Sequence, residues 1–372
     1  MPTISNSKKI AIIGAGEIAL VHAQAAKRIG VQVTHVYNRT KSKAQLIADL
    51  FDDACAVDDL DAIWNCDAID AVIICLPNAF HKDLSIAAMQ AGKDVLIEKP
   101  MGLNGSECQE MVDVADKTGQ LLQLGVVARF TPIATTAKAF VDAGRLGKIY
   151  HAKANYYRRR GIPGLGGWFT TKAESGGGPL IDIGVHVIDL AMHLMGMPNP
   201  TRVSGQTFDC FGKQMGDYVY EHMHAGPTKI DGVFDVEDFA HALVRFDNGS
   251  TLEINAAWAG NFPDDSVKNL VGIFGDQGGV SFELGGDSVR LATTIDGRNV
   301  DVSPQLPQVH ERYEFDVQLA AFVESLETRK PNHACYCGTN GEPDGHDCLK
   351  VQRIIDAIYA SSDAGREIAI EV

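Results

Sequence analysis

Four polar residues recur at helical spacing in an otherwise apolar stretch between positions 176 and 196. The stretch reads GGGPLIDIGVHVIDLAMHLMG, with Pro179 at a first helical position and Gly196 at its end, which predicts one helix of about four turns. At roughly 100° per residue, one narrow stripe holds all four polar side chains, namely Asp182, His186, Asp189 and His193. Because burying an unpartnered carboxylate or imidazole is costly, we expect this stripe to face an internal polar site. The alternative is a solvent-exposed face, but such a face normally also carries Lys, Glu, Arg or Gln, and this one does not.

Length, composition and charge limit the possible partners. The chain has 372 residues, 45% hydrophobic and 22% charged, which predicts two domains with full cores. A formal net charge of −15 argues against nucleic acid or an anionic membrane surface as a partner, since both favour a basic protein. The first residues do not resemble a signal peptide, and no stretch reaches the roughly 18 apolar residues that span a bilayer. We therefore expect a cytoplasmic protein that binds a small molecule.

The cysteines show no disulfide spacing. There are eight, scattered along the chain, which fits a reducing compartment. One cluster combines cysteine with histidine but lacks a CxxC pair, namely His333, Cys335, Cys337, His346 and Cys348. We interpret this cluster as thiols in a surface loop and predict no metal site.

A glycine motif near the start of the chain predicts a dinucleotide site. The strand-like run Lys9–Ile13 is followed by GAGEIA at 14–19 and by a helical stretch to about Arg28. In this G-x-G-x-x-A pattern, Gly14 allows a tight turn, Gly16 lets the backbone approach a pyrophosphate, and Ala19 keeps the helix close to the strand. The N-terminus of the helix would face the anion.

The end of the second strand bears on the choice between NAD and NADP. An NAD enzyme usually has an acidic residue here for the ribose hydroxyls. In this chain Val33–Tyr37 is followed by Asn38, and a basic cluster comes next, consisting of Arg39, Lys41 and Lys43. A missing carboxylate beside an arginine favours a 2′-phosphate and therefore NADP over NAD. The alternative interpretation is a solvated helix start.

Buried strands continue to alternate with helices up to about residue 127. Further strands are expected at Ala71–Leu76, Asp94–Ile97 and Leu121–Val126, which predicts a doubly wound parallel sheet with ligands at the carboxyl ends of its strands. Lys99 stands at such an end, followed by Pro100, which fixes the local backbone and can hold a cis bond. A lysine at this place is also compatible with simple solvation.

The second half of the chain has the pattern of an antiparallel sheet. Alternation begins at Ile149, and later strands are expected at 202–208, 239–246, 250–258, 270–274 and 279–282. Helices are expected at 132–143, 313–327 and 347–361, and the polar segment 209–233 has the character of an insertion.

Aromatic and arginine side chains precede the polar stripe. Tyr156 and Tyr157 stand beside Arg158, and a glycine-rich loop leads through Trp168 to the predicted helix. Aromatic rings next to arginines suit a polyhydroxylated ligand, which offers C–H faces for stacking and hydroxyls for hydrogen bonds. Ordinary sheet packing is the alternative.

Together these motifs resemble the Gfo/Idh/MocA oxidoreductase family, which includes inositol dehydrogenases, glucose-fructose oxidoreductase and many sugar dehydrogenases. The resemblance covers essentially the whole chain, through GAGEIA at 14–19, CLPNAFH at 75–81, EKP at 98–100 and GGGPLIDIGVHVIDL at 176–190. It implies an α/β fold: a Rossmann domain at 1–127, an α+β domain with a large open sheet at 128–345, and a C-terminal helix and tail at 346–372 that return toward the Rossmann domain. It also implies a homodimer or homotetramer formed through the open sheet. The insertion departs from the family pattern and leaves the substrate pocket or the interface open.

The resemblance implies catalytic roles for Lys99, Asp182 and His186 in oxidising a secondary alcohol of a sugar, anhydrosugar or inositol-type polyol. His186 has an ordinary pKa of about 6.5, which suits a base for the hydroxyl proton. Asp182 would bind substrate hydroxyls or orient the imidazole. Lys99 would stabilise the developing alkoxide or share the role of base. We expect Asp189 and His193 to be structural.

These considerations define two sets of ligand contacts. The predicted cofactor contacts, for NADP or NAD, are Gly14, Gly16, Glu17, Ile18, Asn38, Arg39, Leu76, Pro77, Asn78, His81, Glu98 and Lys99. The predicted substrate contacts are Lys99, Tyr157, Arg158, Trp168, Asp182 and His186. Two other functions stay open, transient oxidation during glycoside cleavage and cofactor-dependent regulation. The intact catalytic set argues against a regulator, since a sensor needs no proton relay.

Overall fold

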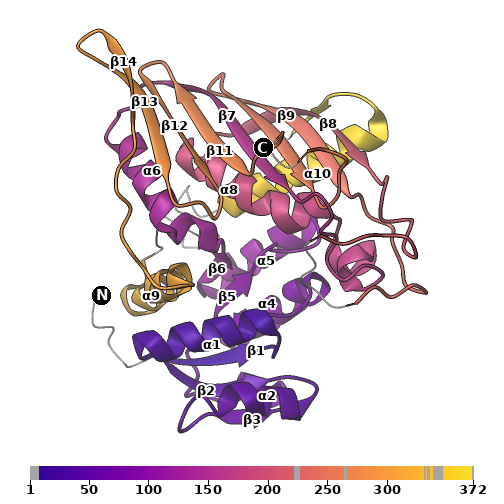
Figure 1. Cartoon of the computed structure of the whole chain (residues 1–372). Coiled ribbons are helices and arrows are strands. Elements are labelled where there is room, and N and C mark those ends of the chain that lie inside the picture. Colours follow the sequence, from indigo (N-terminus) through magenta and orange to yellow (C-terminus); the bar gives the residue numbers. More distant parts are fainter. Residues whose placement is uncertain are drawn as a thin grey trace. The chain divides into compact units, whose positions relative to one another are not determined.

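The computed structural model describes residues 8–221, 227–263, 266–330, 332 and 347–370, together with the backbone of 336–337. The chain forms two units (Figure 1). Unit 1 comprises residues 1–102, 106–131 and 308–349, and unit 2 comprises 103–105, 132–307 and 350–372. This division differs from the expected boundaries, because 308–349 belongs to unit 1 and 350–372 to unit 2.

Unit 1 contains the predicted Rossmann sheet. Its strand order is β15-β6-β5-β4-β1-β2-β3. The parallel strands are β1 (Lys9–Ile13), β2 (Gln32–Tyr37), β3 (Cys55–Val57), β4 (Ala71–Ile74), β5 (Asp94–Glu98) and β6 (Leu122–Gly125). The short β15 (Tyr336–Cys337) adds an antiparallel edge beside β6. The central strands β1, β4 and β5 are almost wholly buried and carry charged residues only at their ends, as in sheets covered on both faces.

Helices cover this sheet, and one of them comes from late in the sequence. They are α1 (Glu17–Ile29), α2 (Lys41–Ala48), α3 (Asp61–Trp64), α4 (His81–Gln90), α5 (Gly105–Thr118) and α9 (Tyr313–Thr328), with the short turns η1 (Asn78–Phe80) and η2 (Val127–Phe130). Phe315 and Phe322 of α9 share a core with Ala23 of α1. Arg28 also donates to both carboxylate oxygens of Asp316, at 2.6–3.0 Å. The late helix α9 therefore packs on the Rossmann sheet, and the start of the last helix joins the core of the same unit through Cys348 and Leu349.

Unit 2 is built on a nine-stranded sheet with the order β14-β13-β12-β11-β7-β10-β9-β8-β16. Its strands are β7 (Ile149–Tyr157), β8 (Pro200–Phe208), β9 (Phe239–Phe246), β10 (Thr251–Ala257), β11 (Leu270–Gly275), β12 (Gly278–Glu283), β13 (Val289–Ile295), β14 (Arg298–Val302) and β16 (Ile368–Ala369). Only the β7–β10 pair is parallel among the described strands of this sheet. The mostly antiparallel sheet was predicted, but β13, β14 and β16 were not.

The helices of unit 2 lie against one face of the sheet (Figure 1). They are α6 (Pro132–Asp142), α8 (Val185–Leu194) and α10 (Asp347–Ala364), whose first three residues belong to unit 1; the short α7 (Lys172–Ser175) and η3 (Trp168–Thr170) also belong to unit 2. Small buried residues such as Ala152 and Ala154 face these helices. The other face carries both aromatic side chains and polar pairs, among them Lys153 3.3 Å from Glu253 and an amide hydrogen bond of 3.0 Å from Asn255 to Asn155.

The polar stripe lies on a helix that begins with a π-helical turn and continues as an α-helix. Residues Leu180–Gly184 (η4) form a π-helical turn, and the α-helix α8 begins at Val185. The expected single α-helix is therefore wrong in its first turn, which holds Asp182. Such wider turns are frequent at functional sites. The described part of the chain has no helix long and apolar enough to cross a membrane.

Candidate active site

The glycine turn before α1 has the shape of an anion site. A Cβ on Gly14, whose φ is +118°, would lie 2.3 Å from the carbonyl oxygen of Cys75, so the fold itself requires this glycine. Gly16 differs, because it is exposed and no atom of the described residues lies within 4 Å of a Cβ placed there. As the N-cap of α1, Gly16 also gives that helix no side-chain cap. Its missing side chain therefore leaves open space beside unpaired helix N–H groups, which suits a phosphate.

Two buried histidines hold the EKP segment in unit 1. The Lys99–Pro100 peptide bond is cis, as the sequence allowed. His22 Nε2 lies 2.8 Å from Glu98 Oε1, and the backbone N–H of Lys99 donates to Glu98 Oε2 at 3.2 Å. The ring nitrogens of His81 lie 2.8 Å from the carbonyl oxygens of Leu76 and Pro100.

His81 was predicted to contact the cofactor, but its ring is fully buried and faces backbone. Burial lowers the pKa of His81, while the two carbonyl oxygens and Glu98 act in the opposite direction and Lys99 adds to the lowering. His81 therefore supports the backbone just after β4, at Leu76, and just after β5, at Pro100. Sequence reasoning missed His22; its only signal is a lone histidine on the alanine-rich face of α1.

The other predicted cofactor residues of unit 1 lie at the carboxyl ends of its strands. Leu76 and Pro77 are half-buried after β4, and Asn78 is buried at the start of η1. After β2, the Asn38 amide donates to the carbonyl oxygen of Thr40 at 3.1 Å. The side chain of Arg39 is exposed and has no partner among the described residues. Glu17 and Ile18 form the first turn of α1.

Unit 2 holds Asp182 and His186 on consecutive turns. Both are half-buried, whereas Asp189 is only 1% exposed. The indole Nε1 of Trp258 donates to Asp182 Oδ2 at 3.0 Å, and Trp258 is fully buried. Trp258 was not among the predicted site residues, although it stands at the end of a predicted strand.

A buried carboxylate fixes the start of the same helix. Glu237 accepts hydrogen bonds from the backbone N–H of Gly178 at 2.9 Å and of Leu180 at 3.1 Å, and from the Tyr359 hydroxyl at 2.9 Å. Burial raises the pKa of Glu237, although its three donors act in the opposite direction. A Cβ on Gly177 would lie 2.0 Å from the Tyr359 hydroxyl, and one on Gly178 would lie 2.0 Å from the Glu237 carbonyl oxygen.

The predicted aromatic contacts fall on two faces of the sheet. Tyr157 lies with Phe239 and Phe262 on the face opposite the helices, so the structure does not bring it to Asp182. Its neighbour Tyr156 packs on the helix side, in the cluster that contains Ile183 and Trp258. Arg158 lies over the Tyr156 ring, 5.6 Å from its centre.

Trp168 is the third predicted aromatic or arginine contact. It stacks on Phe169 at 3.8 Å between ring centres. Phe169 packs against the cluster that contains Trp258. Arg158 and Trp168 therefore border the same cluster as the partner of Asp182, and Tyr157 does not.

The cysteine cluster of the sequence lies mostly outside the described residues. This applies to His333, Cys335, His346 and the side chain of Cys337. Cys348 is buried and disulfide-bonded, which contradicts the expectation of reduced cysteines throughout. Among the described residues, no group of three or more His, Cys, Asp or Glu could hold a metal ion.

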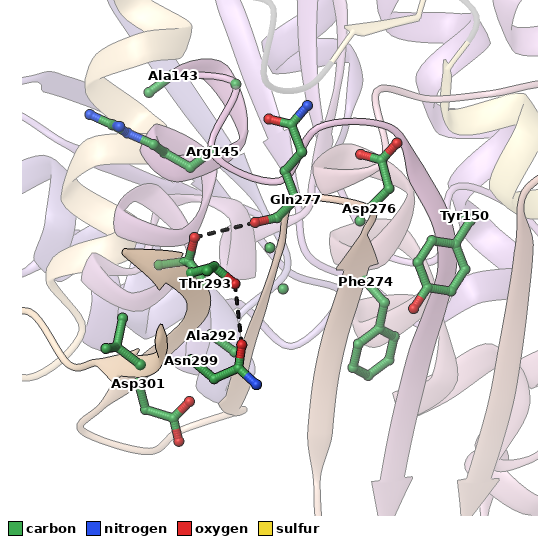
Figure 2. A pocket seen from close by; sticks show the side chains of 16 residues that line it. Ala143, Arg145, Tyr150, Phe274, Asp276, Gln277, Ala292, Thr293, Asn299 and Asp301 are labelled. Carbon is green, nitrogen blue, oxygen red and sulfur yellow. Dashed lines mark hydrogen bonds between the residues drawn. The ribbon is translucent and has the colours of Figure 1, made fainter. Parts of the chain in front are cut away.

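A polar hollow of about 800 Å³ lies elsewhere in unit 2, beside the turn from β11 to β12. Figure 2 shows Asp276 and Gln277 of this turn at its edge. The described residues that line it include none of the predicted site residues. Gly275 lines this hollow, but a Cβ on it would lie 2.0 Å from the carbonyl oxygen of Leu146. Packing of the chain, and no ligand, is therefore enough to account for this glycine. We therefore do not assign this hollow to the site.

The chain matches known families and proteins along most of its length. The family model GFO_IDH_MocA (oxidoreductase family, NAD-binding Rossmann fold) matches residues 8–126, and the model of the GFO/IDH/MocA C-terminal domain matches 134–281. D-Glucoside 3-dehydrogenase of Escherichia coli (strain K12) is 34% identical over 279 residues, 74% of this chain and 77% of that protein. The scyllo-inositol 2-dehydrogenase (NAD(+)) of Bacillus subtilis (strain 168) is 26% identical over 319 residues, 83% of this chain and 84% of that protein.

Solved structures agree in fold. A levoglucosan dehydrogenase in complex with NADH and levoglucosan aligns with a TM-score of 0.80 and 20% identity, covering 98% of this chain and 100% of that one. The two family models and the relative from Escherichia coli identify the family. The chain belongs to the Gfo/Idh/MocA family of oxidoreductases.

Proposed function

We propose that this enzyme transfers hydride between a secondary alcohol of a sugar or polyol and the nicotinamide of NAD(P). The observation that carries the proposal is Gly16. Its missing side chain leaves open space at the N-terminus of α1, and no packing within the described residues requires it. The names of the relatives, which act on a glucoside and an inositol, support a polyhydroxylated substrate.

We propose that Lys99, Asp182 and His186 act together on this substrate. When bound, the cofactor supplies the hydride acceptor. His186 takes the hydroxyl proton, and Asp182 holds substrate hydroxyls or orients the imidazole. Lys99 stabilises the developing alkoxide or shares the role of base. The half-buried π-helical turn that carries Asp182 supports this assignment, because the indole of Trp258 gives the carboxylate a fixed direction.

We propose NADP as the preferred cofactor, with Arg39 as the residue that contacts the 2′-phosphate. The exposed guanidinium, without a partner among the described residues, supports this choice. Glu17, Ile18, Leu76, Pro77, Asn78 and Glu98 are proposed to complete the cofactor contacts. We further propose a homodimer or homotetramer formed through the helix-free face of the unit 2 sheet, where Phe208 is 46% exposed beside Phe239.

A screen of the purified protein tests the function. Near-ultraviolet absorbance of reduced nicotinamide is followed with NAD and NADP against glucosides, free sugars, anhydrosugars and inositols. We expect net reduction of the cofactor with at least one class. Glycoside cleavage without net reduction would instead support transient oxidation, and cofactor binding without either reaction would support a regulator.

A further inference from the structure

Trp258 is a buried side chain whose single polar atom is committed to a proposed catalytic residue. Its exposed fraction is 0%, and its indole N–H donates to Asp182 Oδ2 at 3.0 Å. An indole has no other hydrogen-bonding group, so a buried one is oriented by the acceptor it finds. A hydrogen bond to a carboxylate is also stronger than one between neutral groups.

The backbone of Trp258 is held on both sides. Its N–H donates to the carbonyl oxygen of Asp238 at 2.9 Å, and its own carbonyl accepts from the N–H of Gly161 at 2.8 Å. Trp258 follows directly after β10, in the middle of the sheet. The backbone that carries the indole is therefore fixed at the end of a central strand.

The start of the segment predicted to be an insertion, at residues 210–212, is anchored to the same place. The carboxylate of Asp238 accepts the backbone N–H groups of Cys210 at 3.1 Å, Phe211 at 2.6 Å and Gly212 at 3.0 Å. Asp238 is fully buried. Asp238 thus holds the turn at 210–212 through its carboxylate. Its backbone carbonyl oxygen holds the backbone N–H of Trp258.

The insertion also packs around the indole. Its aromatic and apolar side chains join the cluster that contains Trp258 and Ile183, the latter adjacent to Asp182; they are Phe211, Met215, Tyr218 and Tyr220. Arg160 lies over the Phe211 ring, 4.7 Å from its centre. The hydroxyl of Tyr218 accepts the backbone N–H of Ile162 at 3.4 Å. The insertion is therefore fastened to the loop that leads to Trp168.

We propose that Trp258 is a positioning residue for Asp182 and that residues 210–220 of the insertion keep the indole in place. A contiguous set of contacts runs from the turn at 210–212 through Asp238 and Trp258 to the Asp182 carboxylate. The role of the insertion is then to set the direction of the carboxylate toward substrate hydroxyls. This inference rests on the proposed function, in which Asp182 acts on the substrate.

A double-mutant cycle tests the proposal in the full-length enzyme. Trp258→Phe removes the N–H and keeps an aromatic ring, and Asp182→Ala removes the acceptor. We expect Trp258→Phe to lower kcat/KM by about tenfold or more, the effect of a hydrogen bond to a charged group, with cofactor affinity unchanged. In the Asp182→Ala background the same change should alter kcat/KM by less than about twofold, since its partner is already gone. Val236→Ala is the matched control, because it opens space in the same cluster without touching this bond.

A second measurement does not depend on activity. The protein has three tryptophans, so its indole N–H resonances form a small set in a ¹⁵N correlation spectrum. We expect the resonance of Trp258, assigned as the one missing in Trp258→Phe or by sequential assignment, to move in Asp182→Ala and to stay in Val236→Ala. An unmoved resonance would overturn the proposal.

The kinetic outcomes separate the two claims. A loss in Trp258→Phe that persists in full in the Asp182→Ala background, or no loss at all, would overturn the positioning role. Full activity of Asp182→Ala would instead contradict the proposed function, whereas a shifted Trp258 resonance in that variant would still support the structural contact.

Discussion

Gly16 in unit 1 and Gly178 in unit 2 both stand in glycine-rich turns before a helix, but they lack a side chain for different reasons. At Gly178 the protein itself fills the space, because a Cβ would lie 2.0 Å from the Glu237 carbonyl oxygen. At Gly16 no described atom lies within 4 Å of such a Cβ. Packing explains the glycine at position 178, whereas no packing among the described residues requires the glycine at position 16.

The difference shows how each unit prepares its part of the chemistry. Unit 1 leaves room beside unpaired helix N–H groups, as an anion site requires. Unit 2 instead crowds the start of its helix with Glu237 and Tyr359, which fixes the turn that presents Asp182. Substitutions at the two glycines should therefore separate binding from stability.

The largest expected effect is at Gly16. Gly16→Val places a branched side chain in the space proposed for the pyrophosphate, so it should abolish measurable cofactor binding while the protein stays folded. Calorimetric titration with NAD and NADP, together with circular dichroism, checks both points. Undiminished cofactor binding by a folded Gly16→Val protein would refute the assignment of this turn.

Gly178→Ala should lower the stability of the fold. Its Cβ would meet backbone, so we expect the free energy of unfolding to fall by about 2–3 kcal/mol or more. Gly16→Ala is the matched control. It should change the free energy of unfolding little, because alanine readily adopts the φ of −90° at this position. Denaturant unfolding of both variants makes the comparison. Equal free energies of unfolding for Gly178→Ala and Gly16→Ala would show that packing does not distinguish the two glycines.

A smaller effect is expected at Arg39. Arg39→Ala should weaken NADP binding by about 1.5–3 kcal/mol, as for a hydrogen bond between charged groups, and leave NAD binding nearly unchanged. Binding of both cofactors to both proteins measures this. Equal affinities of the unmodified protein for NAD and NADP would contradict the proposed preference.

Much of this arrangement was predictable from periodicity and motifs. The Rossmann strands, the open sheet and the glycine turn follow from local patterns that packing did not overrule. The π-helical turn did not follow, because Leu180–Gly184 has the apolar pattern of an ordinary helix and its backbone depends on Glu237, far away in the sequence. The β13–β14 hairpin was missed although Asp296-Gly297 is a typical turn signal for it.

The supporting residues of the site could not be found in the same way. Trp258 and Glu237 look like ordinary strand residues until the fold places them beside Asp182 and Gly178. Tyr157 shows the reverse, since it was predicted to contact the substrate but lies on the face of the sheet opposite Asp182, whereas its neighbour Tyr156 lies on the helix side. Side-chain partners between distant segments are set by tertiary packing, which a local pattern does not contain.

The smallest effect concerns pH. Burial raises the pKa of Glu237 above its ordinary value of about 4.3, so the folded state binds this proton more tightly than the unfolded chain. The stability that this group contributes is full below about pH 4.3 and is lost as pH rises through the raised pKa. Glu237→Gln does not titrate at this position. The stability of the unmodified protein relative to Glu237→Gln should therefore fall with rising pH in denaturant unfolding. A difference independent of pH would contradict the raised pKa.

The most direct test of the account is the rate of substrate-dependent cofactor reduction in Lys99→Ala and His186→Asn. We predict that each loses about two to four orders of magnitude in turnover while its cofactor affinity stays unchanged, because a transition-state charge or a proton acceptor is lost. Asp189→Asn is the control, and should lower thermal stability more than turnover, since Asp189 is buried on the same helix. Near-original rates in both Lys99→Ala and His186→Asn would contradict the account.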